Sequence, residues 1–338
     1  MKTDSKDLFK GKNVLVTGGT GTVGPILVKR LLELGANVSV VSIDSDERAK
    51  AVLGDISIFR WGDLRDYKTC LEIAKNKDYV FHLMAVKSNT QKGLSKVASA
   101  YVPFLLCNTN MMEAAFRCGV KRYMFVGSIG EYPAIPIRHE DDVWNGPPAA
   151  NDRYMGIAKR AGEAQAETYL HEYGWDAVRI VRLSNVYGPY DDFDPKTSHV
   201  IPSLISRMIN GENPIKVAGD GTAQRDFIYS EDVVSGMLLA MEKAPACFPI
   251  NLGSGVGISI KDVAEAIADL VPEKPGIEWD PSRPTGDAVR ILAVERAKEA
   301  IGFEASTSLR EGIGKTIHWY LANRDLADRR GKELHEKS

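Results

Sequence analysis

The sequence has little cysteine, and its cysteines form no recognisable pattern. Four of them, Cys70, Cys107, Cys118 and Cys247, stand far apart in a chain of 338 residues. There is no Cys-x-x-Cys pair and no histidine-rich stretch beside any of them. Neither a disulfide framework nor a zinc site is therefore indicated, and we expect free thiols and no metal.

The chain also lacks an excess of charge of either sign and any long apolar run. Its 43 Lys and Arg residues against 45 Asp and Glu leave a net charge of −2, without a basic run suited to a phosphate backbone. No apolar stretch reaches membrane-spanning length, and the first residues, MKTDSKDLFKGK, lack the apolar core of a signal peptide. We therefore expect a cytoplasmic protein that binds neither nucleic acid nor a membrane.

What the first half does contain is an alternation of short apolar runs with helical segments. Near-continuous apolar runs of this length are typical of strands that are buried on both faces, as in parallel β-α-β units. The expected strands cover residues 13–19, 37–43, 56–64, 79–85 and 122–128, with helices at 24–34 and around 108–119. The sequence therefore predicts an α/β fold, a Rossmann-type doubly wound parallel sheet.

After residues 177–189 this rhythm gives way to loops rich in proline and glycine. Helices are expected at 199–210 and 259–271, with a strand at 214–219. We expect these elements to form a smaller α/β C-terminal substrate-binding lobe that shares strands with the first domain. The predicted division is 10–184 with parts of 226–252 for the dinucleotide-binding domain, 185–225 and 253–322 for the smaller lobe, and 323–338 for a charged, frayed tail.

Three glycines follow the first expected strand at a spacing of three. Gly18, Gly21 and Gly24 stand between that strand and an apolar-periodic helix, with Thr22 and Val23 among them. Glycines there let the backbone turn tightly and approach a pyrophosphate, which then sits on free N–H groups at the helix start. Together with the β-α-β rhythm, this pattern predicts dinucleotide binding.

This spacing resembles that of the short-chain dehydrogenases/reductases, and later motifs resemble their extended branch of nucleotide-sugar epimerases, dehydratases and reductases. The resemblance covers about residues 10–320. It implies that Asp63, beside Leu64 in a Gly-Asp-Leu turn, contacts adenine. It also places the strand end that holds Leu83 and Ala85 beside the cofactor ribose, and Asn108 at the position of a helical asparagine of the family.

The residues after the second strand bear on the choice of cofactor. An acidic residue there accepts hydrogen bonds from the ribose hydroxyls and repels a 2′-phosphate. The expected position is Ser42, with Asp44 two residues on and Arg48 nearby. Asp44 favours NAD, whereas Ser42 and Arg48 would admit NADP. We expect NAD, with NADP as the alternative.

The resemblance also implies a catalytic serine, tyrosine and lysine, of which one is missing. Ser128 and Lys159 are at the matching positions, but the tyrosine position, four before the lysine, holds Met155. A thioether has no proton to exchange. Tyr154 is displaced by about 100° around the helix, and would need a one-residue bulge to replace the missing phenol. Glu131 and His199 are the other candidates for the acid/base.

One segment resembles GDP-L-fucose synthases in particular: residues 185–207, together with the stretch around Lys87. The resemblance makes His199 the counterpart of an epimerisation acid, and makes Arg207 and Arg225 a clamp on a diphosphate, for which a planar guanidinium is well suited. However, Gly130 stands where those enzymes carry a cysteine base, and where dehydratases carry a glutamate. The implied substrate-binding residues are Lys87, Ser128, Asn185, His199, Val200, Arg207, Arg225 and Arg290.

Without those bases, redox chemistry at a sugar carbon is the remaining reaction of the family. We therefore expect NAD-dependent redox at C4 of a GDP-linked hexose or heptose, in surface-polysaccharide sugar biosynthesis. Three alternatives stay open: an epimerase/reductase, a catalytically impaired dinucleotide-binding protein, and action on a UDP- or dTDP-sugar. We expect a homodimer formed through the two long helices, with Met111, Met112, Phe116, Ala164 and Tyr169 as the candidate face.

Overall fold

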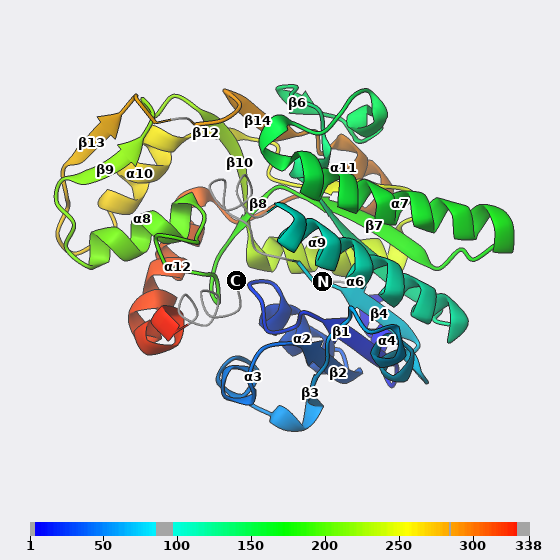
Figure 1. The fold of residues 1–338 in the computed structure, drawn as a ribbon. Coiled ribbons are helices and arrows are strands. Elements are labelled where there is room, and N and C mark those ends of the chain that lie inside the picture. Colours follow the sequence, from blue (N-terminus) through cyan, green and yellow to red (C-terminus); the bar gives the residue numbers. More distant parts are fainter. Residues whose placement is uncertain (1–3, 86–96, 284, 330–338) are drawn as a thin grey trace.

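The computed structural model describes residues 4–85, 97–283 and 285–329. Its main element is a sheet of seven strands in the order β3-β2-β1-β4-β5-β7-β11, and every neighbouring pair is parallel (Figure 1). The strands are β1 (Asn13–Thr17), β2 (Asn37–Ser42), β3 (Phe59–Trp61), β4 (Tyr79–His82), β5 (Arg122–Ser128), β7 (Val178–Leu183) and β11 (Ile250–Leu252). The predicted Rossmann-type sheet is confirmed.

Helices cover both faces of this sheet because its strands are apolar on both sides. In β1, Val14 and Val16 belong to one buried cluster and Leu15 to another, as the alternation of side chains along a strand requires. The helices on the first face are α1 (Asp4–Phe9), α2 (Gly24–Glu33), α9 (Ser230–Lys243) and α11 (Glu295–Ile301). Those on the second face are α4 (Tyr67–Ala74), α6 (Val97–Arg117) and α7 (Arg153–Tyr173). A further helix, α3 (Asp46–Leu53), follows β2.

A second, smaller region lies at the carboxyl end of the large sheet (Figure 1). It has a five-stranded sheet of β6 (Ile137–Arg138), β8 (Asn185–Tyr187), β10 (Gln224–Tyr229), β12 (Gly257–Ser259) and β14 (Val289–Leu292). A two-stranded sheet joins β9 (Ile215–Ala218) and β13 (Ile277–Asp280). Three helices, α8 (Val200–Ile209), α10 (Ile260–Ala268) and α12 (Leu309–Ala322), enclose its own apolar core.

The chain passes between the two regions several times, and buried polar groups hold the crossings together. Asp226, at the start of β10, accepts hydrogen bonds from the Ser254 N–H at 2.8 Å, the Ser254 hydroxyl at 2.7 Å and the Leu292 N–H at 3.3 Å. Its side chain is fully buried. One carboxylate therefore joins β10, β14 and the loop that follows β11.

Three segments differ from the sequence-based expectation. The strand expected at 56–64 is only Phe59–Trp61, because Asp55 accepts from the Ser57 N–H at 2.8 Å and starts the 3-10 turn η1 (Ile56–Ile58). The helix expected around 108–119 begins earlier, at Val97. The tail expected to fray from residue 323 is helical at 324–329, where Ala327 is buried in the smaller region's core.

Candidate functional site

The glycine-rich turn between β1 and α2 has the shape of a phosphate cradle. Gly18 has φ +67°, and a Cβ there would lie 3.2 Å from the backbone of Leu83. A Cβ on Gly24 would lie only 2.3 Å from the Gly19 carbonyl oxygen. No side chain caps the start of α2, whose N-cap is Val23, so its first N–H groups are left for a ligand. The turn therefore fits a dinucleotide pyrophosphate.

A buried polar group follows β2 beside this turn. Asp44 accepts from the Thr20 hydroxyl at 2.6 Å, and its backbone N–H donates to Ser42 Oγ at 3.1 Å. Arg48 also turns toward Thr20, donating to its carbonyl oxygen at 3.0 Å, with Nε 3.8 Å from the Asp44 carboxylate. The Arg48 side chain is 3% exposed, so its charged group contacts other parts of the protein and not the solvent.

The other sequence-predicted cofactor residues lie along the carboxyl edge of the sheet. Asp63, just after β3, is bound by Arg65 with Nε at 2.8 Å, and that hydrogen bond lowers the pKa of the carboxyl group. Leu64 is buried, Leu83 is half-buried and Ala85 is exposed. The turn itself is tied to the smaller region, because the Thr22 hydroxyl donates to Asp191 Oδ1 at 3.1 Å.

A buried histidine links β1 to α6 beneath this edge. His82, the last residue of β4, has Nδ1 2.8 Å from the Thr17 hydroxyl and Nε2 2.9 Å from Asn108 Oδ1. Burial lowers the pKa of His82 to about 4, so the ring is neutral at pH 7. Asn108, predicted from the family pattern, therefore orients this ring in the structure.

Ser128 and Lys159 lie at the carboxyl end of β5, one from the strand and the other from α7. The Ser128 hydroxyl accepts from the Gly130 N–H at 3.1 Å. Lys159 Nζ donates to the Val126 carbonyl at 2.6 Å and lies 4.9 Å from the centre of the Phe104 ring. Burial lowers the pKa of the Lys159 ammonium group.

Met155, at the position of the family's tyrosine, and its neighbour Tyr154 lie on the first turn of α7. The helix runs without interruption from Arg153 to Tyr173, so it contains no bulge that would bring Tyr154 into the place of Met155. Met155 is half-buried, one turn before Lys159. Tyr154 is 49% exposed and its ring meets Tyr101 edge-on at 6.5 Å.

Glu131, another candidate for the acid/base, is turned into the protein. Its side chain is fully buried, and Oε1 accepts from the Ser128 N–H at 2.5 Å. Burial, and then the nearby Glu163, raise the pKa of Glu131. In this position it shapes the backbone under Ser128 and does not face solvent.

A network of buried charges, which the sequence interpretation missed, lies behind Ser128. Arg182 on β7 donates to Glu163 on α7 from Nε at 2.8 Å and Nη2 at 2.6 Å, and both side chains are 1% exposed. Arg182 Nη1 also donates to the hydroxyl of Tyr132 at 2.9 Å, which in turn donates to Asn251 at 2.6 Å. The sequence carried part of the signal, since two arginines, Arg179 and Arg182, interrupt the apolar run of β7, but it does not show which of them is buried.

The substrate residues predicted from the smaller region lie on separate elements. Asn185 donates to the Asp226 carbonyl at 2.7 Å and so joins β8 to β10. His199 is exposed just before α8, whose first residue is Val200. Lys87 lies outside the described residues.

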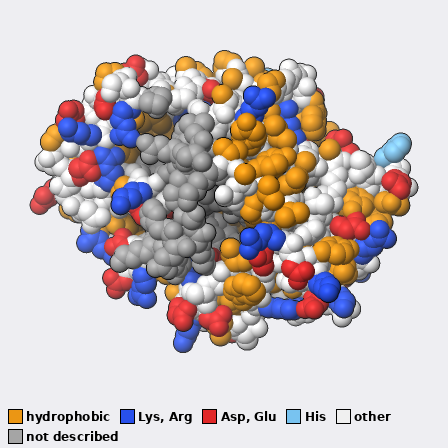
Figure 2. All heavy atoms as spheres, in the orientation of Figure 1, with side chains coloured by type: hydrophobic (Ala, Val, Ile, Leu, Met, Phe, Trp, Pro, Cys, Tyr) orange, Lys and Arg blue, Asp and Glu red, His pale blue; other side chains and the backbone are white. Residues whose placement is uncertain are grey.

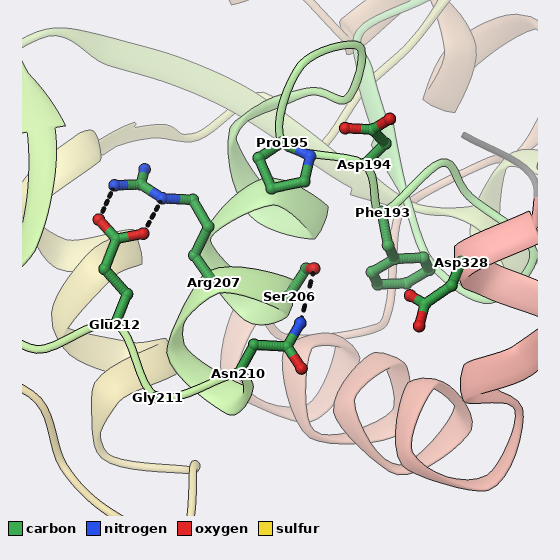
Figure 3. A pocket seen from close by; sticks show the side chains of 9 residues that line it. All are labelled: Phe193, Asp194, Pro195, Ser206, Arg207, Asn210, Gly211, Glu212 and Asp328. Carbon is green, nitrogen blue, oxygen red and sulfur yellow. Dashed lines mark hydrogen bonds and ion pairs between the residues drawn. The ribbon is translucent and has the colours of Figure 1, made fainter. Parts of the chain in front are cut away.

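The two arginines predicted as a diphosphate clamp have different surroundings. Arg207, on α8, forms two hydrogen bonds with Glu212, of 2.8 and 2.5 Å, at the edge of a pocket (Figure 3). Arg225, on β10, donates to the Thr285 carbonyl at 2.7 Å. The guanidinium group of Arg207 is therefore already bonded to the carboxylate of Glu212.

Arg225 instead has a second arginine beside it. It is in register with Arg290 on the parallel strand β14, so the two side chains emerge on the same face, one strand spacing apart. Burial and the charge of Arg290 lower the pKa of Arg225. Arg290 donates to Asp152 at 2.7 Å. Two adjacent guanidinium groups are suited to a diphosphate.

Residues 4–85, 97–283 and 285–329 contain no group of three or more His, Cys, Asp or Glu side chains placed to hold a metal ion. Within the same ranges, no helix is both long enough and apolar enough to span a membrane. The described site combines a glycine-rich turn that fits a pyrophosphate with a serine and a lysine at the end of β5.

Comparison with known proteins agrees with this geometry. Residues 14–253 match the model of the NAD dependent epimerase/dehydratase family. The chain is 28% identical to a probable GDP-L-fucose synthase of Oryza sativa subsp. japonica over 93% of both chains. It is 30% identical to a dTDP-4-dehydro-6-deoxy-D-allose reductase of Streptomyces bikiniensis, covering 93% of this chain and 98% of the relative.

Among solved structures, the epimerase Mth375 of Methanothermobacter thermautotrophicus superposes with a TM-score of 0.86 at 27% identity, over 96% of this chain and 97% of that one. The family model spans well over half of the chain and includes both the glycine-rich turn and the segment from Ser128 to Lys159. The chain therefore belongs to the NAD-dependent epimerase/dehydratase family, the extended short-chain dehydrogenases/reductases whose members modify nucleotide-linked sugars.

Proposed function

We propose that this protein is a GDP-sugar 4-dehydrogenase/reductase, which carries out NAD-dependent redox at C4 of a GDP-linked hexose or heptose. The observation that carries the proposal is the pairing of Ser128 and Lys159 at the end of β5, with glycine at position 130. Ser128 is suited to hydrogen-bond the reacting sugar oxygen and Lys159 to hold the nicotinamide ribose. The cofactor would supply a hydride acceptor or donor, and residue 130 itself carries no side chain that could act as the base for epimerisation.

The preference for NAD follows from the contacts of Asp44 and Arg48. Asp44 keeps an acidic group at the end of β2, next to the turn that fits the pyrophosphate. Arg48 would be the partner of a 2′-phosphate, but its guanidinium group is buried and bound to the Thr20 carbonyl. An acidic group at this position suits the ribose hydroxyls of NAD and repels a 2′-phosphate, which favours NAD over NADP.

The choice of GDP as the carrier rests on relatives and on the segment 185–207. The rice relative is a probable GDP-L-fucose synthase, whereas the Streptomyces relative acts on a dTDP-linked keto sugar. Arg225 suits the diphosphate that both carriers share, with Arg290, which also holds Asp152, beside it. A thermal-shift comparison of GDP, UDP and dTDP identifies the nucleobase of the carrier, because a ligand that binds the native state raises the melting temperature of the protein.

Two readouts test the reaction itself. The purified protein is incubated with NAD and a panel of GDP-hexoses and GDP-heptoses, or with NADH and GDP-4-keto sugars. Absorbance at the NADH band and the mass of a 4-keto product are then followed. Redox change without inversion of neighbouring centres supports a dehydrogenase/reductase, and inversion supports the epimerase/reductase alternative. No redox change with any sugar, together with intact NAD binding, would indicate the catalytically impaired alternative.

We also propose a homodimer that assembles through α6 and α7. The residues expected on that face need correction, because Met111 and Met112 are fully buried in the core and Phe116 packs on Tyr169 at 4.9 Å. Figure 2 shows hydrophobic side chains gathered where the first turns of these helices lie in Figure 1. The exposed large apolar residues of the two helices are Val102, Leu106, Tyr154, Ile157 and Tyr173. Light scattering of wild type and Leu106→Glu tests this face.

A further inference from the structure

The space beside Gly130 is filled by a carboxylate from another segment. A Cβ built on Gly130 would lie 3.2 Å from both Cβ and Cγ of Asp152, and 3.4 Å from its Oδ1. Asp152 ends the turn η4 (Ala150–Asp152), directly before α7 begins. The direction in which a side chain of residue 130 would point is therefore occupied by the Asp152 side chain.

The same approach places Asp152 beside the turn that follows Ser128. Gly130 donates its N–H to the Ser128 hydroxyl at 3.1 Å, so Ser128 and the Asp152 side chain both adjoin Gly130. A Cβ on Gly156, one turn into α7, would lie 2.5 Å from the Gly130 carbonyl oxygen. The first turn of α7, which bears Met155, is thus fixed against the same backbone.

The carboxylate of Asp152 is oriented and partly accessible. Oδ2 accepts from Arg290 Nη2 at 2.7 Å, and Oδ1 is the oxygen near Gly130. The side chain is 31% exposed. By contrast, Glu131 is fully buried. Asp152 therefore combines a fixed position, access from solvent and an oxygen that can accept a proton.

We propose that Asp152 is the catalytic proton acceptor that replaces the tyrosine missing at Met155. The proposal rests on the redox function proposed above. In the oxidation, the O–H bond of the sugar hydroxyl breaks and its proton passes to Oδ1 of Asp152. The C–H bond at the same carbon breaks and its hydride passes to the oxidised nicotinamide, while the C=O bond forms. In the reduction, protonated Asp152 returns the proton to the alkoxide oxygen.

The test compares Asp152→Asn with Asp287→Asn in the full-length protein. Asparagine keeps the shape of Asp152 and an acceptor for Arg290, but it takes up no proton. We expect kcat with the GDP-sugar to fall about 100- to 10,000-fold, the usual contribution of a general acid/base, with KM changed less than about threefold. Asp287 also contacts Arg290, at 3.9 Å, and Arg138, at 2.8 Å, so its variant removes a similar charge. Because this change keeps the carboxylate of Asp152, we expect Asp287→Asn to keep kcat within about threefold of wild type, and its Tm is measured alongside because Arg138 is fully buried.

A second variant separates proton transfer from simple support of Arg290. Met155→Tyr places a phenol one turn before Lys159, at the position that the rest of the family pattern requires. Added to Asp152→Asn, it should restore at least about tenfold in kcat and shift the pH-rate profile to that of a phenol. If the loss of kcat in Asp152→Asn came only from a displaced Arg290, the added Met155→Tyr change would not restore kcat.

The outcomes distinguish this proposal from the proposed function. Retention of wild-type kcat by Asp152→Asn, or a loss confined to KM without rescue by Met155→Tyr, overturns the role of Asp152 and leaves the redox function standing. Absence of turnover by the wild-type protein overturns both. If Asp152→Asn does not fold, Asp152→Ser and Asp152→Glu are compared, and equal activity of these two variants also overturns the role.

Discussion

The buried ion pair between Glu163 and Arg182 allows a stability prediction of defined size. The two side chains are 1% exposed and share hydrogen bonds of 2.8 and 2.6 Å. Glu163→Gln keeps the shape of the glutamate but leaves the Arg182 charge without its partner. Removing one member of a buried pair costs about 3 to 5 kcal/mol of the free energy of unfolding. Glu131, with Oε2 3.8 Å from Arg182 Nε, remains as a second carboxyl group beside the guanidinium, so we expect the lower end of that range.

This free energy corresponds to a measurable change in Tm. For 338 residues the entropy of unfolding at Tm is about 0.7 kcal/mol/K, so a loss of about 3 kcal/mol lowers Tm by about 4 °C. The matched control is Glu72→Gln, which removes an ion pair with Arg60 whose side chains are 55% and 56% exposed. A pair this exposed contributes less than about 1 kcal/mol, so Tm should fall by about 1 °C or less.

Differential scanning calorimetry of the two variants and wild type at pH 7 measures both effects. Equal Tm values for Glu163→Gln and wild type would refute the reasoning, because they would mean that the buried guanidinium needs no carboxylate. A double variant, Glu163→Gln with Arg182→Met, provides a further check. It removes both charges, and should be more stable than the sum of the two single changes predicts.

Three further predictions concern the cofactor turn, the buried histidine and the thiols. Gly24→Ala should abolish NAD binding, measured by fluorescence titration, since its Cβ would lie 2.3 Å from the Gly19 carbonyl oxygen. Gly314→Ala is the control and should leave NAD binding unchanged, because a Cβ there would meet no atom within 4 Å. His82, with its pKa lowered to about 4, takes up a proton only on unfolding as the pH falls from about 6.5, so its contribution to the free energy of unfolding should drop by about 3 kcal/mol between pH 6.5 and 4. Urea titrations should show this pH dependence in wild type but not in His82→Gln. Cys70, whose pKa burial raises to about 12, should react with a thiol reagent at pH 8 only after unfolding, and reaction in the native state would contradict this burial.

The parallel sheet and the cofactor turn were predictable because their signals are local. Apolar runs at β-α-β spacing and three glycines after the first strand depend on sterics and burial within short segments. Ser128 and Lys159 followed from their places in motifs. Their positions at the end of β5 follow from the strand and helix that carry them.

What the sequence did not reveal are contacts made between distant segments. Asp152 and Gly130 are 22 positions apart, and no motif relates them until the turn before α7 folds against β5. The pairing of Arg225 with Arg290 depends on the register of β10 and β14, which the sequence does not determine locally. Tyr154 illustrates the reverse case, since the rotation of an uninterrupted helix was enough to predict that it points elsewhere than residue 155.

The repeated crossing of the chain between its two sheets limits how this protein can be recombined with its relatives. A fragment that ends after β7 would lose β11 and α9, and so expose the edge of β7 and the apolar side of α2. The buried Asp226 would lose the Ser254 and Leu292 donors in any chimera that exchanged residues 253–322 alone for a segment of different geometry. Exchange of single loops at the carboxyl edge of the sheet leaves these crossings intact. Directed evolution of substrate choice should therefore proceed by loop grafting, and swaps of the whole smaller region should yield insoluble chains.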